Sequence, residues 1–377
     1  MSVHDKVNKK TGPYKLLALD GGGIRGLMTL EVLAKIEATL REGLGRDESF
    51  VLADYFDYIA GTSTGAIIAT ALSLGWSVEK IQGFYKESGK AMFDKAFLLS
   101  VTRKLVYKYG DEKLSNKLKH AEVFGEQTLG SDKLKTLLML VMRNVNTDSP
   151  WPVSNNPKAK FNDPNLPDSN LKLPLWQLVR ASTAAPTFFP PETVQLGSKE
   201  FIFVDGAITP YNNPAFQLFL MATLEPYQLM WPTGEDNMLL VSVGTGLTPN
   251  INLELKTRKM HTAYNAITIP GALMLASQTQ QDLLCRIFGK CVSGDPIDGE
   301  VDDLLGAKGP LESKLFTYMR YDAELSNEGL KKLGLADSVQ LEHVQKMDSV
   351  EYMDELERIG KAIAKKVKPE HFAKFLQ

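Results

Sequence analysis

Short apolar runs that end at glycine or aspartate constrain the fold of this chain more than any other feature. Four such runs occur, at residues 16–19 before Asp20, 58–60 before Gly61, 201–204 before Asp205, and 238–243 before Gly244. Apolar runs without polar alternation are typical of strands that are buried on both faces of a mostly parallel sheet. We therefore predict four sheet strands with Gly and Asp residues at their carboxyl ends.

Segments with helical periodicity follow three of these four runs. Leucine and isoleucine recur at spacings of three and four from Leu27 to Leu40, and residues 66–74 and 214–222 are apolar over helical lengths. Strand–turn–helix repetition is typical of an α/β fold, with a mostly parallel central sheet flanked by helices. Ligands bind such sheets at the carboxyl ends of the strands, where the Gly and Asp residues lie.

A single domain accounts for most of the 377 residues in this interpretation. Residues 1–13 are polar and lysine-rich, and we expect a flexible segment there, followed by one domain over residues 14–377. A C-terminal helical extension is expected from about residue 326, because residues 353–367 have apolar side chains at helical spacing. Six of the 19 prolines lie between Pro150 and Pro174, which predicts a long irregular loop.

Charge and cysteine content exclude several classes of protein. The 43 basic and 45 acidic residues leave a formal net charge of −2, which argues against a basic nucleic-acid-binding protein. Cys285 and Cys291 have no familiar metal-binding spacing and form no disulfide framework, so we expect reduced thiols. We find no signal-peptide pattern and no apolar run of about 18 residues, so we expect a cytoplasmic protein without a membrane span.

The segment Gly61-Thr62-Ser63-Thr64-Gly65 matches G-x-S-x-G, the pattern of a nucleophile elbow. An apolar strand precedes it and an apolar helix follows, which is the context that the elbow requires. Glycines on either side allow a tight turn that exposes the serine hydroxyl. Ser63 is therefore a candidate nucleophile for acyl transfer.

The segment Asp20–Gly26, with the sequence DGGGIRG, fits three interpretations. Its glycines satisfy G-x-G-x-x-G between a strand and a helix, which is the context of a dinucleotide fingerprint. That fingerprint also needs an acidic residue at the end of a second strand, and here Glu42, Asp47 and Glu48 follow no strand. Consecutive glycine N–H groups at a helix N-terminus also suit an oxyanion hole. A tight turn without a ligand is the third interpretation.

A serine nucleophile needs a general base, and the residues alone leave its identity open. None of the histidines lies at a glycine-flanked strand end: His4, His120, His261, His343 and His371. Asp205 does lie there, before Gly206. An aspartate with its usual pKa of about 3.9 is a weak base, so it could act only if burial raised its pKa and it bonded the hydroxyl directly. Capping of the turn before Gly206 is the other role that fits.

In their order and spacing, these motifs resemble those of the patatin-like phospholipases. The resemblance rests on residues 20–26, 61–65 and 205–207, with further family-like segments at 180–189 and 347–366. It extends from about Lys15 to Val367, and Ala207 stands where many members have glycine. It implies a patatin-like α/β/α sandwich. It also implies a lipid acyl hydrolase that cleaves fatty-acyl esters of membrane glycerophospholipids, a phospholipase A type of reaction.

The resemblance also implies a role for each motif. Ser63 would be the nucleophile and Asp205 its base, in a Ser–Asp dyad that works through an acyl-enzyme without histidine. Backbone N–H groups of Gly21, Gly22, Gly23 and Thr64 would form the oxyanion hole. The supporting motif residues would be Asp20, Arg25, Gly26, Gly61, Gly65 and Gly206. The resemblance implies no metal and no cofactor.

Partners and regulation allow more than one hypothesis. The expected partner is a membrane phospholipid, contacted peripherally at the inner face of the membrane, and not a nucleic-acid polymer. Some bacterial proteins that resemble this chain are activated by cyclic nucleotides in antiphage defence. A cyclic-nucleotide activator bound in a C-terminal pocket is therefore a second hypothesis, and a homo-oligomer fits both. A dinucleotide-binding oxidoreductase, based on the glycine pattern, is the third.

Two further segments each allow two interpretations. Residues 91–109 mix apolar and basic side chains, which fits a lid or membrane-docking helix as well as an ordinary helix packed on the core. Lysines near the C-terminus fit either a solvated face or an anion-binding patch: Lys361, Lys365, Lys366, Lys368 and Lys374.

Overall fold

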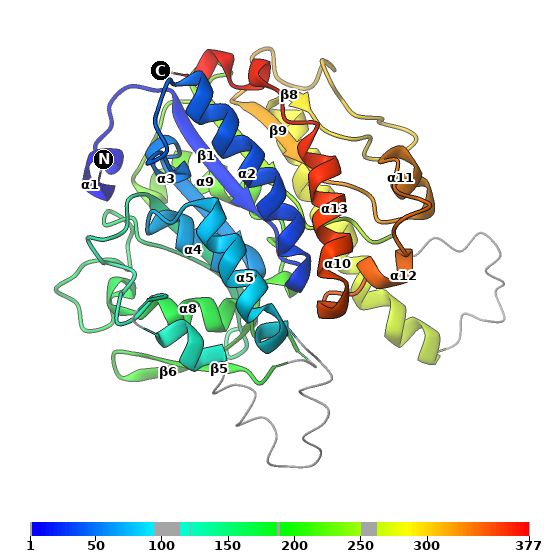
Figure 1. Ribbon diagram of the computed structural model, residues 1–377. Coiled ribbons are helices and arrows are strands. Elements are labelled where there is room, and N and C mark those ends of the chain that lie inside the picture. The colour runs from blue at the N-terminus through cyan, green and yellow to red at the C-terminus, as the bar shows by residue number, and fades with distance from the viewer. Residues whose placement is uncertain (1, 94–113, 121, 187–188, 250–261, 377) are drawn as a thin grey trace.

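A mixed β-sheet with helices on both faces forms the centre of the molecule, as the computed structural model in Figure 1 shows. The structure describes residues 2–93, 114–120, 122–186, 189–249 and 262–376. Within these residues the strands are β1 (Tyr14–Leu19), β2 (Tyr58–Thr62), β3 (Leu137–Asn144), β4 (Ser149–Ser154), β5 (Glu192–Leu196), β6 (Lys199–Asp205), β7 (Met238–Val243), β8 (Lys290–Ser293) and β9 (Thr317–Tyr321). Their order is β5-β6-β3-β2-β1-β7-β9-β8, and β4 pairs with β3.

Strand direction divides the sheet into two parts. The strands β3, β2, β1, β7, β9 and β8 run parallel to their neighbours in this series. β4 and β6 both pair antiparallel with β3, and β5 pairs antiparallel with β6. The mostly parallel sheet that we predicted is thus confirmed.

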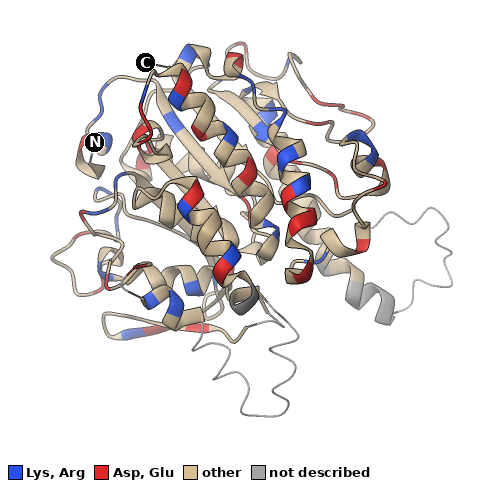
Figure 2. Ribbon diagram, in the orientation of Figure 1, with Lys and Arg blue, Asp and Glu red and all other residues tan. Residues whose placement is uncertain are grey.

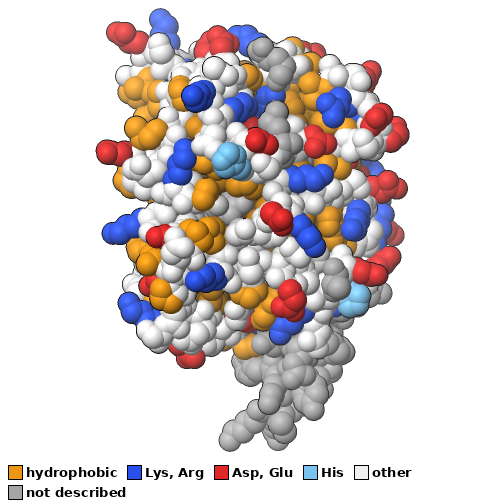
Figure 3. Space-filling model, turned by 90° about the vertical axis from the view of Figure 1, so that its left-hand side faces the viewer, with side chains coloured by type: hydrophobic (Ala, Val, Ile, Leu, Met, Phe, Trp, Pro, Cys, Tyr) orange, Lys and Arg blue, Asp and Glu red, His pale blue; other side chains and the backbone are white. Residues whose placement is uncertain are grey.

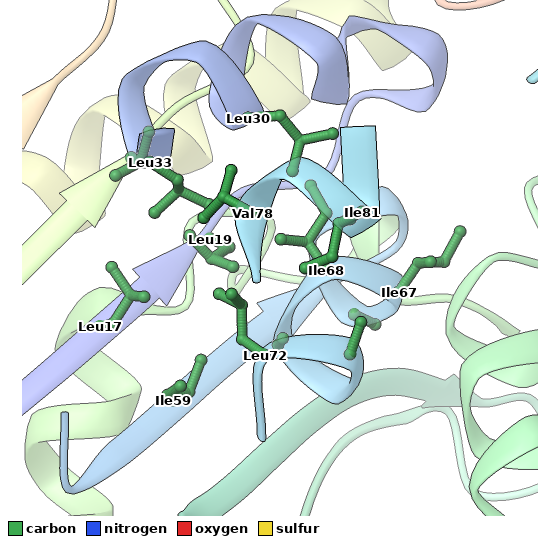
Figure 4. Packing of buried hydrophobic residues seen from close by; sticks show 14 of the residues in the cluster. Leu17, Leu19, Leu30, Leu33, Ile59, Ile67, Ile68, Leu72, Val78 and Ile81 are labelled. Atoms are coloured by element: carbon green, nitrogen blue, oxygen red, sulfur yellow. The ribbon is translucent and has the colours of Figure 1, made fainter. Parts of the chain in front are cut away.

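Helices cover both faces of the sheet and bury a separate apolar core on each. One face is covered by α2 (Gly26–Gly43), α4 (Thr64–Ser73), α5 (Val78–Phe93), α8 (Leu175–Ser182) and α13 (Met353–Ala364), and the other by α9 (Ala215–Thr223) and α10 (Thr262–Phe288). Side chains of β1 alternate between the cores, because Leu17 and Leu19 belong to the first and Leu16 and Ala18 to the second. Figure 4 shows β1, β2, α2, α4 and α5 meeting in the first core.

The remaining helices lie at the periphery. They include α1 (Val3–Val7), α3 (Leu52–Tyr55), α11 (Asn327–Lys332) and α12 (Leu341–Val344), and residues 114–119 are also helical. The segment that we expected to be flexible contains α1, and its Lys6 side chain is buried and donates to the carbonyl oxygens of Ala53 and Phe56. These contacts connect the N-terminal segment to the body of the protein.

The four predicted strands and the helices after them are all present, but the direction of one strand differs from the expectation. β6, which contains the apolar run 201–204, is antiparallel to β3. An apolar run predicts that a strand is buried and says nothing of its direction. β6 follows β5 through a tight turn at Gly197, whose φ is +61°. The pair forms a hairpin that adds to the sheet edge at the end of β3.

The proline-rich segment is only partly irregular. Ser149–Ser154 forms strand β4, although it contains Pro150 and Pro152. Among the described residues β4 pairs with β3 alone, so it is an edge strand, where proline is tolerated because its missing N–H faces away from the sheet. The prediction of one long loop was therefore wrong for its first residues.

The C-terminal helix docks on the domain as predicted. α13 packs along α2 through a close backbone approach, since a Cβ on Gly360 would lie 2.8 Å from the Met28 Cα (Figure 1). Leu356, Ile359 and Ile363 enter the first core. Of residues 91–109, only the last turn of α5 is described, where Met92 and Phe93 are buried. Residues 94–109 lie outside the described residues.

Charged side chains are distributed without a dominant sign. Figure 2 shows acidic and basic residues interspersed along the helices, and Figure 3 shows the same mixture on one face of the surface. This distribution agrees with the net charge of −2. In the part of the chain that the structure describes, no helix is both long and apolar enough to cross a bilayer.

Candidate functional site

The turn between β2 and α4 holds Ser63 in a conformation that is uncommon for a serine. Its φ is 54° and its ψ is −122°, and such a left-handed conformation costs roughly 1–3 kcal/mol. The flanking glycines make the turn possible. A Cβ on Gly61 would lie 2.1 Å from the Gly65 carbonyl oxygen, and a Cβ on Gly65 would lie 2.3 Å from that of Leu19. The local geometry is that of a nucleophile elbow.

Strand β3 brings Asp205 to Ser63. Along β3, Val141 pairs with Thr62 at the end of β2, and the next residue, Met142, pairs with Asp205 at the end of β6. β2 and β6 therefore end opposite adjacent residues of β3, although these two strands run in opposite directions. Ser63 Oγ donates a hydrogen bond of 2.7 Å to Asp205 Oδ2.

The surroundings of Asp205 favour a basic carboxylate. Burial raises the pKa of Asp205 to about 7, against the opposing effects of the Ala207 N–H, the Ser63 hydroxyl and the Arg180 charge. The Ala207 N–H donates to Oδ1 at 2.7 Å, so the capping role that we considered is also fulfilled. A general base is most effective when its pKa is near the working pH.

The histidines lie elsewhere in the described residues. His371 bonds the Tyr321 hydroxyl, and His343 bonds Glu355. His4 bonds Asn8, and His120 is exposed beside Glu122. His261 lies outside the described residues. The geometry therefore offers Asp205, not a histidine, as the hydrogen-bond acceptor of the Ser63 hydroxyl.

Ser182 completes the support of the elbow and was not singled out by the sequence. Its Oγ accepts a hydrogen bond of 2.9 Å from the Ser63 N–H and donates one of 2.6 Å to the Val141 carbonyl oxygen. Ser182 is fully buried at the end of α8. The segment 180–189 was noted for its resemblance to the family, but no local pattern indicates that this serine reaches a residue 119 positions earlier.

The glycine-rich loop lies directly beside Ser63. A Cβ on Gly21 would lie 3.1 Å from the Ser63 Cβ, and one on Gly22 would lie 2.2 Å from Thr245 Oγ1. The Gly21 N–H donates to the Asn212 carbonyl oxygen at 3.1 Å, so this predicted oxyanion donor is already engaged. The N–H groups of Gly22 and Gly23 donate to no acceptor among the described residues.

The start of α4 adds a further backbone donor. Thr64 is the first residue of this helix, and its N–H has no acceptor within the helix. The other motif glycines support close packing around it. A Cβ on Gly26 would lie 2.6 Å from Thr64 Oγ1, and one on Gly206 would lie 2.3 Å from the Val141 carbonyl oxygen.

Asp20 anchors the glycine-rich loop through an ion pair. Its carboxylate accepts bonds from Arg320 Nη1 at 3.0 Å and Nη2 at 2.6 Å, and Arg320 also bonds Asp322. Burial raises the pKa of Asp20 to about 6, and the Arg320 charge opposes this. Arg320 was missed by the sequence analysis, because it lies 300 positions from its partner.

Arg25 is buried at the other end of the loop. Its Nε approaches the Gly22 carbonyl oxygen at 3.4 Å, and burial lowers its pKa to about 10. Arg25 thus contacts the backbone of the loop, as expected of an anchor.

The geometry also bears on the dinucleotide interpretation. The strand that follows α2 in the chain order of the sheet is β2, which ends at Gly61 and Thr62. A dinucleotide fingerprint needs an acidic residue at this position to bind the ribose. The nucleophile elbow occupies that place instead. Among the described residues, no cluster of three or more His, Cys, Asp or Glu side chains is arranged to hold a metal ion.

Comparisons with known proteins identify similar sequences. Residues 17–219 match the family model described as patatin-like phospholipase. Patatin-like protein 1 of Arabidopsis thaliana is 32% identical over 257 residues, which cover 62% of this chain and 59% of that protein. An intracellular phospholipase A2 of Caenorhabditis elegans is 31% identical over 65% of this chain and 20% of its own length. A cGAMP-activated phospholipase of Vibrio cholerae is 32% identical over 54% of this chain and 56% of its own length. The alignments thus span less than two thirds of each of these relatives.

Proposed function

Because this chain belongs to the patatin-like phospholipase family, we propose that it hydrolyses fatty-acyl esters of membrane glycerophospholipids, as a phospholipase A. The observation that carries the proposal is the hydrogen bond of 2.7 Å between Ser63 and Asp205 beside the glycine-rich loop. A serine hydroxyl bonded to a carboxylate with a raised pKa has both a nucleophile and a base in place. The relative from Caenorhabditis elegans is named a phospholipase A2, which supports the same class of substrate.

The first half of the proposed reaction is acylation of Ser63. Asp205 Oδ2 accepts the hydroxyl proton while Oγ attacks the ester carbonyl carbon, and a tetrahedral intermediate forms. The N–H groups of Gly22, Gly23 and Thr64 stabilise its oxyanion, since Gly22 and Gly23 follow the Gly21 that lies beside Ser63, Thr64 follows Ser63, and none of these donors is engaged with the described residues. Asp205 then returns the proton to the leaving alcohol, and the acyl-enzyme remains.

Deacylation reverses these roles with water as the nucleophile. Asp205 accepts a proton from the water molecule that attacks the acyl carbon, and the fatty acid leaves as Ser63 regains its proton. Both half-reactions need Asp205 in its ionised form. The Ala207 N–H holds the carboxylate in place during both steps.

Fatty-acid release from mixed phospholipid vesicles tests this proposal. We expect release by the wild-type protein and a loss of at least about a thousandfold for Ser63→Ala and Asp205→Asn, because a nucleophile and its base act as a unit. Thermal unfolding of each variant serves as the control for folding. Turnover by Ser63→Ala at the wild-type rate would overturn the assignment of the nucleophile.

A second proposed function is activation by a cyclic dinucleotide, as part of antiphage defence. The observation that favours it is the similarity to the cGAMP-activated phospholipase of Vibrio cholerae. Fatty-acid release measured with and without cGAMP tests it. Release that appears only with the nucleotide would support gating, and equal release without it would contradict gating.

The C-terminal part of the chain lines a cavity, but its charges do not favour binding of an anionic cyclic dinucleotide. A cavity of about 810 Å³ lies between α10, β9 and α11, and its lining includes seven carboxylates and four cationic side chains. All four of the cations are already paired: Arg286 with Asp282, Arg320 with Asp20, Lys332 with Glu328, and Lys366 with Asp295. An excess of negative charge disfavours a phosphodiester. The predicted C-terminal nucleotide pocket therefore gains no support from this cavity.

A further inference from the structure

In the N-terminal half of α10, the described side chains include an exposed apolar stripe, whereas polar side chains further along the opposite face are buried. Ile269 and Leu273 are 51% and 65% exposed, and Ala272 and Ala276 on the same stripe are exposed as well. These positions recur at spacings of three and four, so they share one helix face. On the opposite face Gln278, Gln281 and Asp282 are buried. This arrangement is the reverse of that in a water-facing helix.

The same half of the helix has no charge. Residues 262–281 contain no Asp, Glu, Lys or Arg, in a chain of which 23% is charged. Figure 2 shows the described part of this region without acidic or basic colour, whereas α13 has both. Exposed apolar surface without charge mixed into it marks an interaction site.

The helix that carries this apolar stripe adjoins the loops of the candidate active site. Ser277, one turn after Leu273, donates to the Thr209 carbonyl oxygen at 3.4 Å, and Gln278 approaches Asp20 at 3.4 Å. Ile208, three residues after Asp205, is itself 43% exposed. Since Thr209 contacts α10 through Ser277, its neighbour Ile208 adds an exposed apolar side chain to the segment between the proposed base and this helix.

We propose that the exposed stripe of α10, formed by Ile269, Ala272, Leu273 and Ala276, is the surface with which this protein docks on a phospholipid bilayer. The proposal rests on the proposed function, because a phospholipase must take its acyl ester from a bilayer. A helix that lies in the membrane interface buries its apolar face at the boundary between headgroups and acyl chains. Because the same helix contacts the segment after Asp205, docking by this stripe would bring the candidate site near that boundary and shorten the path of an ester to Ser63.

Binding to vesicles separates docking from chemistry. We would measure cosedimentation of the Ser63→Ala protein with vesicles of phosphatidylcholine and phosphatidylglycerol. The same measurement would be made after adding Ile269→Ser and Leu273→Ser together. We expect these two changes to weaken vesicle binding about tenfold or more, because two apolar side chains no longer leave water. Thermal unfolding should change little, since both side chains are exposed.

The matched control is Phe161→Ser. Phe161 is 64% exposed, close to the exposure of Leu273. It precedes Asn162, which bonds the carbonyl oxygen of Ser154 beside the amino end of β3, away from Ser63. We expect this variant to bind vesicles like its parent. An equal loss with Phe161→Ser would show nonspecific adhesion and overturn the proposal.

Activity assays keep the failure of docking distinct from the failure of the proposed function. In the active protein, the α10 double variant should retain turnover of a water-soluble short-chain ester and lose about tenfold in vesicle hydrolysis. Vesicle binding equal to that of the parent would overturn the docking proposal, whatever the activity. A change in oligomeric state by light scattering, with unchanged vesicle binding, would assign the stripe to contact between copies. No hydrolysis of any ester by the wild-type protein would instead refute the proposed function.

Discussion

At Ser63, the backbone conformation and the side-chain chemistry depend on different neighbours. Asp205 bonds the hydroxyl, whereas Ser182 bonds the N–H of the same residue. Ser182 thereby holds a backbone conformation that a serine adopts at a cost. In the proposed reaction, the hydroxyl of Ser63 would need that conformation to approach an ester.

Ser182→Ala tests this support. Loss of the hydroxyl leaves the buried Ser63 N–H without an acceptor, so we expect kcat to fall about tenfold to a hundredfold while KM changes little. Steady-state kinetics on a soluble ester would measure both constants. The matched control is Ser73→Ala, because Ser73 is also fully buried and its Oγ accepts a bond from Thr136 away from the site. A similar fall in kcat for Ser182→Ala and Ser73→Ala would show that the loss of activity comes from a general loss of stability and not from the support of Ser63.

In the proposed mechanism, the pH dependence of turnover follows from Asp205. Since only the ionised carboxylate accepts a proton and its pKa is about 7, kcat/KM should rise with pH up to about 7 and then level off. Below that value it should fall about tenfold per pH unit. A pH–rate profile with a soluble ester checks this. A limb with its midpoint near pH 4 would show that burial does not raise the pKa.

The raised pKa of Asp205 also affects folding stability. Turnover should rise with pH, whereas the contribution of this group to stability should fall. A folded-state pKa above the unfolded value means that the folded protein binds the proton more tightly, so this contribution to stability falls as pH rises from about 4 to about 7. Asp205→Asn removes the buried charge, and we expect it to unfold at the same or a higher temperature than wild type at pH 8. Thermal unfolding at pH 8 measures this. A clearly lower midpoint would mean that the carboxylate stabilises the fold.

Among the structural elements, β3 determines how the site is assembled. It pairs with the end of β2 through Val141 and with the end of β6 through Met142. The apolar runs predicted β2 and β6 as strands. They could not predict that β6 is antiparallel to β3, because strand direction depends on pairing and not on local hydrophobicity. Ser63 and Asp205 are therefore adjacent because of the register in which β2 and β6 pair with β3. A short stretch of sequence does not determine that register.

The close packing of β2 against the start of α4 requires glycine at position 61. Gly61→Ala would place a Cβ 2.1 Å from the Gly65 carbonyl oxygen, so β2 and α4 would have to separate. We expect at least about a hundredfold loss of kcat/KM and a lower unfolding temperature. Gly83→Ala is the control, because a Cβ on this glycine of α5 would meet nothing within 4 Å. It should be neutral or stabilise the protein by up to about 1 kcal/mol. Near-normal turnover by Gly61→Ala would contradict the tight elbow.

At the scale of the molecule, the site depends on both ends of the chain. Asp20 lies at the end of β1 and Arg320 in β9, and the pair is buried. The Ile24 N–H also bonds the Met347 carbonyl oxygen, so the segment after α12 contacts the glycine-rich loop. The motifs at Asp20, Ser63 and Asp205 could be found because each has a local pattern. Arg320 and Ser182 could not, because their roles arise only from contacts made in the folded chain.

Removal of one partner of the buried pair tests this dependence. Arg320→Met leaves Asp20 buried without its cation, which we expect to cost about 3–5 kcal/mol in the free energy of unfolding. Combining it with Asp20→Asn should recover part of that loss, because the uncompensated charge is removed. Urea unfolding of the two single variants and the double variant measures the coupling. If the losses in the free energy of unfolding of the two single variants add up in the double variant, Asp20 and Arg320 are not coupled, which would contradict a stabilising ion pair.

The pairing of β1 has a consequence for any attempt to isolate the part of the chain that matches the family. That match ends at residue 219, but β1 pairs along its whole length with β7, which begins at Met238. A fragment that ends at 219 would therefore leave one edge of β1 unpaired, although all six residues of this strand are buried in the whole chain. Such an edge is a template for association with other chains. The region that defines the family is expected to aggregate unless the rest of the sheet is present to cap it.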